Sequence, residues 1–371
     1  MNFGMTYHLC NFQHIRPPHE VDQERILDWI AEAHGRAAKN EAVRHSVREK
    51  MNQLGIGKQR IEKRGLLMRD LFEEDWAKME IYPVDHQPHG SGFTKRSEFY
   101  DREVSQILHH FYPEHATLPV HLIHVTCTGY VAPSPAQKLV SARGAGTSTT
   151  VTHAYHMGCY ASIPAIRMGM GYLSLGDSPV DIVHTEVSSL HMHPLKHESE
   201  QLLVQGLFGD GFIKYTVQQQ SGPGLKVLAL HEETIPDSTH CMTWGCVDEG
   251  FNMTLSKEVP VLIARNLKGY LERLCAKTGL DAQSVIKEGF FAIHPGGPKI
   301  LTHIKELLGL ESHQIQHSNQ VLKDFGNMSS ATLPHIWERM LNDSKVPSGA
   351  QIIGLAFGPG LSASGGLFQK G

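Results

Sequence analysis

Short apolar runs alternate with amphipathic helical patterns along most of this chain, and this alternation restricts its possible folds more than any other feature. The run His121–Val125 ends in turn residues and is followed by a helical pattern over 132–142. Phe290–His294 is a second such run, and a helical pattern over 299–308 follows it. Strands that alternate with helices are typical of α/β proteins with buried sheets. We therefore expect an α/β fold.

The alternation occurs in both halves of the chain, as a duplicated unit would produce. The stretch 219–224, Gln-Gln-Ser-Gly-Pro-Gly, is the best linker candidate near the middle, because Gly and Pro favour turns. We therefore divide the chain into residues 1–220 and 221–371. The apolar spacing also predicts a continuous helical region over 21–51 and a helix over Asn327–Leu341.

The composition excludes several classes of protein. Lys and Arg number 34 and Asp and Glu number 38, so the formal net charge of −4 gives no sign of nucleic-acid binding. No apolar run reaches the roughly 18–20 residues that span a bilayer, and the N-terminus lacks the pattern of a secretory signal. The six cysteines are scattered without a CxxC spacing, which favours free thiols and a cytoplasmic protein.

Three short segments contain candidate catalytic residues, and the first surrounds Cys159. Gly158 permits a sharp turn, and a helical pattern follows Cys159. A cysteine at a helix N-terminus lies at the positive end of the helix dipole, which stabilises the nucleophilic thiolate. A buried structural cysteine explains the segment equally well. Pro164 predicts that the helix begins late or is kinked.

The other two segments contain His294 and Asn327. His294 leaves an apolar run and enters a loop rich in Pro and Gly, and catalytic groups are common in such loops. Asn327 precedes small residues that suit the start of a helix. Taken singly, His294 suits a structural role and Asn327 suits a helix cap. An amide directed at a reacting carbonyl is the alternative for Asn327.

Together, the three segments resemble the type III polyketide synthases of the chalcone synthase superfamily. The resemblance rests on the chain order Cys, His, Asn and on five stretches: Gly158-Cys159, Leu207-Phe208-Gly209-Asp210-Gly211, His294-Pro295-Gly296-Gly297-Pro298, Gly326-Asn327-Met328-Ser329-Ser330-Ala331 and Phe357-Gly358-Pro359-Gly360. The segment Cys127–Tyr130 is more similar to bacterial members than to plant ones. The resemblance implies a thiolase-like fold, in which two βαβα halves pack as α-β-α-β-α layers. The N-terminal half would carry the cysteine, and the C-terminal half the histidine and the asparagine.

The resemblance also implies a reaction. Cys159 would carry the starter acyl group and then the growing polyketide. His294 would hold Cys159 as a thiolate and, with Asn327, would bind the thioester carbonyl of malonyl-CoA, so that the pair stabilises the enolate formed as CO2 leaves. The chain would be an acyltransferase that extends an acyl-CoA iteratively and closes a pyrone or resorcinol-type ring. Acyl-CoA and malonyl-CoA are the ligands implied, with no metal or organic cofactor, and the implied assembly is a homodimer.

Further positions follow from the same resemblance. The substrate cavity would be lined by Phe208, which matches a gatekeeper aromatic, and by Met253, Ser188, His191, Gly129 and Ser329. A cavity glycine of the plant enzymes falls near Trp244, so we do not expect chalcone as the product. The candidates for CoA binding are Lys58, Arg60, Lys63 and Arg64, although each also suits a solvated helix face.

Alternative functions remain open at this point. His191, His193 and His197 are closely spaced, but no Cys or carboxylate pattern completes a metal site there, and we expect no metal. The nearest alternative is a β-ketoacyl synthase that accepts an acyl carrier protein and stops after one condensation. A catalytically silent paralogue is a second alternative. The 25 histidines also permit a metal-binding protein.

Overall fold

A computed structural model describes residues 6–176, 178–219, 222–297 and 299–371. Its strands are β1 (Tyr7–Ile15), β2 (His19–Asp22), β3 (Lys63–Leu66), β4 (His121–Thr126), β5 (Thr150–Tyr155), β6 (Val180–Glu186), β7 (Gly211–Gln218), β8 (Leu225–Thr234), β9 (Met242–Val247), β10 (Gly250–Leu255), β11 (Phe290–Ile293), β12 (Gln351–Gly358) and β13 (Ser362–Lys370). Its α-helices are α1 (Gln23–Ala37), α2 (Glu41–Gln53), α3 (Phe93–Phe111), α4 (Pro135–Ala142), α5 (Ser162–Leu175), α6 (Ser199–Leu207), α7 (Val259–Ala276), α8 (Ala282–Glu288), α9 (Ile300–Leu308), α10 (Gln316–Phe325) and α11 (Thr332–Asn342).

Nine of the strands form one mixed sheet in the order β11-β12-β13-β8-β1-β7-β6-β4-β5. Strand β1 joins its two parts, because it pairs antiparallel with β7 on one side and with β8 on the other. The parallel pairs lie at the two ends of this order: β4 with β5 and β6, and β11 with β12. The N-terminal strand therefore links a sheet built from the first half of the chain to one built from the second.

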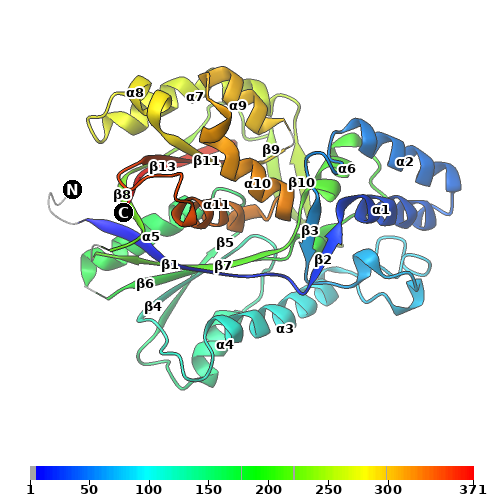
Figure 1. Ribbon diagram of the computed structural model, residues 1–371. Helices are drawn as coiled ribbons and strands as arrows, with labels where there is room; N and C mark the ends of the chain where they lie inside the picture. The colour runs from blue at the N-terminus through cyan, green and yellow to red at the C-terminus, as the bar shows by residue number, and fades with distance from the viewer. Residues whose placement is uncertain (1–5, 177, 220–221, 298) are drawn as a thin grey trace.

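Two helices, α5 and α11, lie between the two parts of the sheet. Figure 1 shows α5 and α11 in the middle of the molecule, with α7, α8 and α9 beyond one part of the sheet and α3 and α4 beyond the other. Helix α5 contacts β4, β6 and β7 as well as β13, and α11 contacts β7 as well as β11 and β12. Ile166, Val217 and Trp337 belong to one apolar cluster that spans this layer. This arrangement confirms the predicted α-β-α-β-α layers of a thiolase-like fold.

Some predicted element boundaries differ from the structure. The helical region expected over 21–51 is two helices, because Lys39 has a positive φ of 51° and Asn40 caps α2 by accepting a hydrogen bond from the Ala42 N–H. The stretch 143–151, whose Gly, Ser and Thr residues suggest a loop, runs into strand β5. Helix α11 begins at Thr332, five residues after Asn327, and a 3₁₀ turn over Ser329–Ala331 precedes it.

The predicted linker at 219–224 connects two strands of the same sheet. Residues 220 and 221 lie outside the described part of the chain. Strand β7 ends at Gln218 and β8 begins at Leu225, and both pair with β1. The division into residues 1–220 and 221–371 stays a prediction, since the two halves share this sheet. Among the described residues, no helix combines the length and apolar character needed to cross a membrane.

Candidate active site

A glycine turn positions Cys159 just before helix α5. Gly158 has a φ of 80°, and the Ala161 N–H donates to the Gly158 carbonyl across 3.1 Å. The helix begins at Ser162, so Pro164 lies in its first turn, where a missing N–H is tolerated. The late start predicted from Pro164 is therefore confirmed. Cys159 lies in the turn that leads into the helix, rather than in the helix itself.

Cys159 borders a narrow cavity of about 40 Å³, which we call the cysteine cavity. Its lining combines apolar side chains with a few polar groups: Arg64, Leu71, Cys127, Thr128, Gly158, Cys159, Ser188, Ser189, His191, Met192, Val204, Gln205, Phe208, Trp244, Met253, Ser329 and Pro359. Small concave sites with few polar groups are typical of substrate pockets. The thiol is only 6 % exposed and faces a confined space.

Burial dominates the electrostatics of Cys159. The pKa of the thiol is raised to about 12, mainly by burial and to a smaller extent by the nearby Glu186 carboxylate, while the side chains of Ser329 and Asn327 act in the opposite direction. The Cys159 Sγ lies 3.8 Å from the Ser329 Oγ. The free protein therefore holds Cys159 as a thiol at neutral pH.

A second cysteine, Cys127, lies beside the first and was not among the predicted site residues. Its Sγ is 2.9 Å from the Ser329 Oγ and 3.5 Å from a carboxylate oxygen of Glu186. Glu186 is fully buried and accepts hydrogen bonds from the Cys127 N–H and the Thr128 hydroxyl, among other donors. A buried carboxylate is stable only when its oxygens accept hydrogen bonds. These bonds therefore hold Cys127 and Thr128 in place, and both residues line the cysteine cavity.

The backbone of Asn327 forms an isolated parallel β-bridge with Phe208, and Asn327 does not cap a helix. Its N–H donates to the Leu207 carbonyl across 3.0 Å, and its carbonyl accepts from the Gly209 N–H across 2.9 Å. Its side-chain Oδ1 accepts the Ser329 N–H across 2.8 Å. Among the described residues, its buried Nδ2 has no hydrogen-bond partner. The amide therefore keeps a free donor inside the protein.

His294 follows the last residue of β11, as predicted. Its N–H donates to the Leu355 carbonyl across 2.8 Å, which continues the pairing with β12. Burial lowers the pKa of the imidazole to about 3, so the ring is neutral. Within the described part of the chain, both ring nitrogens lack hydrogen-bond partners although they are buried. Pro298, in the same loop, lies outside the described residues.

His294 borders a second cavity, of about 380 Å³, which we call the tunnel cavity. Phe357 lines the tunnel cavity and Pro359 lines the cysteine cavity, so the short segment between them passes from one to the other. Since neither nitrogen of His294 has a partner in the described structure, His294 and Cys159 are not hydrogen-bonded in the free protein. The cysteine and the histidine thus face neighbouring cavities.

The structure places most of the predicted cavity residues where they were expected. Phe208, Met253, Ser188, His191 and Ser329 line the cysteine cavity. Gly129 is the exception and corrects the prediction, because it packs against the Tyr100 ring, where even a Cβ atom would lie 2.1 Å from a ring carbon. Cys127 and Thr128 take its place in the lining.

Trp244 occupies much of the space that a smaller residue would leave open. Its Nε1–H donates to the Cys127 carbonyl across 2.6 Å, and its ring stacks on Phe251 at a centroid distance of 5.5 Å. His191 meets the same tryptophan edge to face. The fixed indole explains why the cysteine cavity is narrow.

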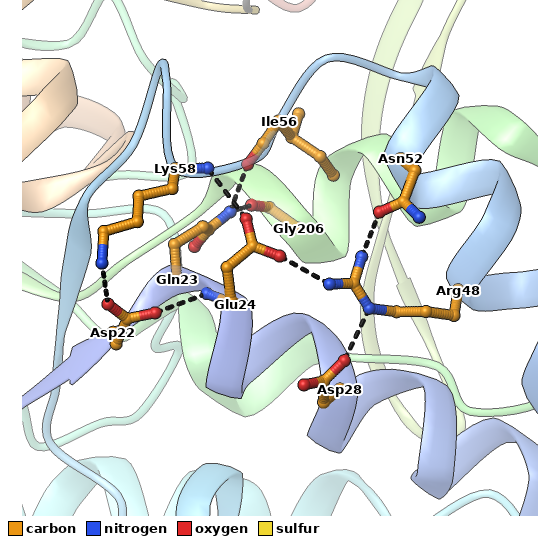
Figure 2. Close-up of polar contacts among 9 residues, drawn as sticks. All are labelled: Asp22, Gln23, Glu24, Asp28, Arg48, Asn52, Ile56, Lys58 and Gly206. Atoms are coloured by element: carbon orange, nitrogen blue, oxygen red, sulfur yellow. Dashed lines mark hydrogen bonds and ion pairs between the residues drawn. The ribbon is translucent and has the colours of Figure 1, made fainter.

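Two of the predicted CoA-binding lysines have acidic partners. Figure 2 shows the Lys58 Nζ paired with Asp22, at 3.0 Å, while the Lys58 backbone N–H donates to Glu24. Lys63 pairs with Glu20 across 2.7 Å. Arg60 is exposed. A role for these three residues in CoA binding stays a prediction, and the lysines would have to exchange a carboxylate for a phosphate.

Arg64 differs from the other three candidates in its burial, and its role in CoA binding also stays a prediction. It is fully buried, and its Nη1 donates to the carbonyls of Gln205 and Phe208 across 2.8 and 2.7 Å. Burial lowers the pKa of its guanidinium to about 9. The side chain therefore positions the segment before Phe208, and it borders the cysteine cavity instead of the protein surface. Lys257 and Lys299, which line the tunnel cavity, are the basic residues that the sequence did not single out.

The three closely spaced histidines do not converge on one point. His191 Nε2 bonds to the Thr128 carbonyl, His193 Nε2 to the Phe251 carbonyl and His197 Nε2 to the Pro194 carbonyl. Since His191 Nδ1 also accepts the Phe251 N–H, its neutral tautomer is fixed. These imidazoles act as structural hydrogen-bonding groups.

Comparison with known proteins agrees with this geometry. Residues 226–370 match the family described as "Chalcone and stilbene synthases, C-terminal domain". The chain is 27 % identical over 291 residues to 1,3,6,8-tetrahydroxynaphthalene synthase of Streptomyces coelicolor, covering 76 % of this chain and 77 % of that one. It is 27 % identical over 365 residues to phloroglucinol synthase of Pseudomonas fluorescens, covering 96 % and 97 %.

The fold agrees as well. The crystal structure of the Streptomyces coelicolor tetrahydroxynaphthalene synthase, a bacterial type III polyketide synthase, superposes with a TM-score of 0.80 at 24 % identity, over 98 % of this chain and 99 % of that one. Residues 226–370 thus match the C-terminal domain of chalcone and stilbene synthases, and the chain is similar along most of its length to type III polyketide synthases, which are acyltransferases.

Proposed function

We propose that this enzyme loads an acyl group from acyl-CoA onto Cys159, extends it iteratively with malonyl-CoA by decarboxylative condensation, and cyclises the product to a pyrone or a resorcinol-type phenol. The observation that carries the proposal is the set of unsatisfied buried groups: the Asn327 Nδ2 and both ring nitrogens of His294 lack partners in the described structure. Leaving such groups unpaired costs about 1–3 kcal/mol each. A ligand carbonyl would satisfy the two donors among them, the Asn327 Nδ2–H and the N–H of the neutral His294 ring.

Loading begins when the Cys159 sulfur attacks the thioester carbonyl of acyl-CoA. The thiol proton must leave as the carbon–sulfur bond forms, and the neutral imidazole of His294 is the acceptor that we assign. The proton then passes to the departing CoA thiolate, so that CoA leaves as a thiol. The tetrahedral oxyanion is stabilised by the Asn327 amide, since a fixed donor in a water-poor site acts strongly on developing charge.

Extension uses the same two donors. The malonyl-CoA thioester carbonyl would accept hydrogen bonds from the Asn327 Nδ2–H and from one N–H of the neutral His294 ring. As CO2 leaves, the electron pair of the broken C–C bond forms the enolate, whose negative oxygen these donors stabilise. The enolate carbon attacks the acyl thioester on Cys159, and the Cys159 sulfur leaves. The extended chain then lies on CoA and can return to Cys159.

The two cavities divide the substrate between them. We assign the tunnel cavity to the CoA arm, because it is the larger of the two and carries Lys257 and Lys299 among its lining residues. The cysteine cavity would hold the growing chain. Phe208 lines this cavity and forms a backbone bridge with Asn327, which suits a side chain at the passage between the cavities. CoA thioesters suffice as substrates, as they do throughout this family, with no further cofactor.

We also propose that the enzyme is a cytoplasmic homodimer. All six cysteines are free thiols, which suits a reducing compartment where CoA thioesters are present. Strand β5 is the edge of the large sheet, and the nearby Tyr130 is 62 % exposed. An edge strand and an exposed aromatic are features that a second subunit would cover. Sedimentation equilibrium should therefore give twice the 41.2 kDa chain mass, and a monomer would contradict this part of the proposal.

Purified enzyme supplied with acyl-CoA and malonyl-CoA alone tests the reaction. We expect CO2 release and products extended by more than one malonyl unit, detected by mass spectrometry. A β-ketoacyl synthase would need malonyl groups on an acyl carrier protein and would stop after one extension. A catalytically silent paralogue would release no CO2 from malonyl-CoA or from malonyl groups on an acyl carrier protein. Either result would overturn the proposal.

A further inference from the structure

A group of three potential metal ligands lies outside the catalytic machinery. The His240 Nε2 is 3.5 Å from the Cys241 Sγ, the Cys241 Sγ is 3.8 Å from a Glu258 carboxylate oxygen, and that oxygen is 3.9 Å from the His240 Nε2. The three ligand atoms therefore form a nearly equilateral triangle. They come from two segments 17 residues apart, so no local sequence motif predicts the group.

We propose that His240, Cys241 and Glu258 form a binding site for a divalent cation of the zinc class. Zinc takes thiolate, imidazole and carboxylate ligands at about 2.3, 2.0–2.1 and 2.0–2.2 Å. At tetrahedral angles these bond lengths place the ligand atoms about 3.3–3.6 Å apart. The observed triangle is wider by only a few tenths of an ångström. Three protein ligands leave a fourth position for water or an external ligand.

The burial of the three groups suits such a site. Cys241 is fully buried, whereas the side chains of His240 and Glu258 are 68 % and 67 % exposed. A cation would thus be held from beneath by the soft sulfur and from the solvent side by the imidazole and the carboxylate. Thiolate with imidazole and carboxylate favours zinc over magnesium or calcium, which prefer oxygen ligands alone.

Backbone hydrogen bonds fix the positions of the two segments. The Cys241 N–H donates to the Ser238 carbonyl across 2.9 Å, and the Cys241 carbonyl accepts the Ser256 N–H across 2.7 Å. The Glu258 N–H donates to the Ser256 Oγ across 3.1 Å, immediately before helix α7. Because these bonds already hold the two segments together, cation binding would cost little conformational free energy for ordering the ligands.

The site lies at the rim of the tunnel cavity. Met242, which follows Cys241, and Lys257 and Val259, which flank Glu258, all line that cavity. A bound cation would clamp the loop before β9 to the start of α7. Occupancy would therefore stabilise the folded enzyme and fix one wall of the cavity, independently of the chemistry at Cys159.

Cobalt(II) titration of the purified full-length enzyme tests the site, because a thiolate-bound cobalt ion absorbs in the near ultraviolet and shows visible bands when tetrahedral. The parent for all variants carries Cys246→Ser, which removes the exposed cysteine of β9 as a competing ligand. We expect one cobalt ion per chain with a sulfur charge-transfer band, and displacement of cobalt by zinc. Absence of that band in the parent would overturn the proposal.

Three variants assign the ligands. Cys241→Ser should abolish the charge-transfer band, while His240→Ala and Glu258→Gln should each weaken cobalt binding at least tenfold. Because the last two replace exposed side chains, they should fold even if Cys241→Ser does not. Zinc should raise the Tm of the parent, since a ligand that binds only the folded state stabilises it, and should not raise the Tm of the two exposed-site variants. Unchanged cobalt affinity in both would contradict the assignment.

Discussion

At the scale of single residues, burial keeps the two proton-transfer groups of the site neutral. Burial raises the pKa of Cys159 to about 12 and lowers the pKa of His294 to about 3. The resemblance to the family implies that His294 holds Cys159 as a thiolate, but no hydrogen bond joins the two in the described structure. We therefore infer that the thiol loses its proton during acyl transfer, when the substrate brings the groups together.

The pH dependence of alkylation tests this inference. Because the pKa of the thiol lies well above neutrality, its thiolate fraction should increase about tenfold for each pH unit below that pKa. We expect the logarithm of the iodoacetamide inactivation rate to rise with a slope near one between about pH 6 and pH 9. Peptide mapping should locate the label at Cys159. A rate that is already constant above about pH 6–7 would show a preformed thiolate–imidazolium pair and contradict the inference.

The positions of the three candidate catalytic residues at turns were easier to predict from the sequence than their surroundings. Cys159, His294 and Asn327 lie in short segments whose Gly and Pro residues mark turns. Arg64 gave no such signal, because it follows a lysine in a charged stretch while its own side chain is buried by contacts with residues about 140 positions away. Long-range packing of this kind cannot be deduced from local residue patterns.

At the scale of elements, the turn before α5 determines where Cys159, the proposed nucleophile, lies. Gly158 has a positive φ of 80°, and a Cβ atom there would lie 2.7 Å from the Pro359 Cδ. Any other residue would strain the backbone and push Cys159 away from the segment that separates the two cavities. Glycine at this position is thus a requirement of the site as well as of the fold.

The variant Gly158→Ala tests whether stability and acyl transfer require glycine at this position. We expect the variant to lose about 1–3 kcal/mol of stability, the usual cost of a side chain in a strained left-handed conformation, and to lose most acyl transfer to Cys159. Chemical denaturation and acyl-enzyme formation give the two readouts. Gly146→Ala is the matched control, because a Cβ atom there meets nothing within 4 Å. Equal stability and activity in the two variants would show that the turn is not critical.

Element types were predictable from periodicity, and some boundaries were not. The strands that end near the site were located to within a residue or two, because their apolar runs stop at turn residues. The break between α1 and α2 depends on one residue with a positive φ, Lys39, and on the cap at Asn40, neither of which interrupts the apolar spacing. Strand β5 is the strand expected before the Cys159 turn, but its first two residues, 150 and 151, were assigned to the preceding irregular stretch because they lack an apolar run.

At the scale of the whole molecule, two layers of sheet and the helices between them place groups from distant segments in one region. Cys159 arrives through the turn before α5, and Asn327 through the bridge that joins it to Phe208. His294 comes from the end of β11. Alternation predicted an α/β fold, and the resemblance to the family implied the layers. The joining of both parts of the sheet through β1 depends on pairing between strands far apart in the chain.

The volume of the cysteine cavity should limit the starter and the product. With Trp244 in place we expect short acyl-CoA starters to be preferred. Trp244→Ala should raise kcat/KM for a medium-chain acyl-CoA relative to acetyl-CoA by about tenfold or more, as expected for removing steric exclusion. Products from a panel of starters can be identified by mass spectrometry. Met253→Leu, which nearly conserves volume, should leave the preference unchanged, and the same preference in all three proteins would refute the volume argument.

The central claim is that His294 and Asn327 stabilise the enolate while Cys159 carries the chain, and release of labelled CO2 from malonyl-CoA tests it most directly. Cys159→Ala should still release CO2 but form no extended product. His294→Ala and Asn327→Ala should each lower CO2 release by about 10²–10³-fold, the usual cost of losing one oxyanion donor. Release at the parental rate by the histidine and asparagine variants, or extended products from Cys159→Ala, would contradict the account.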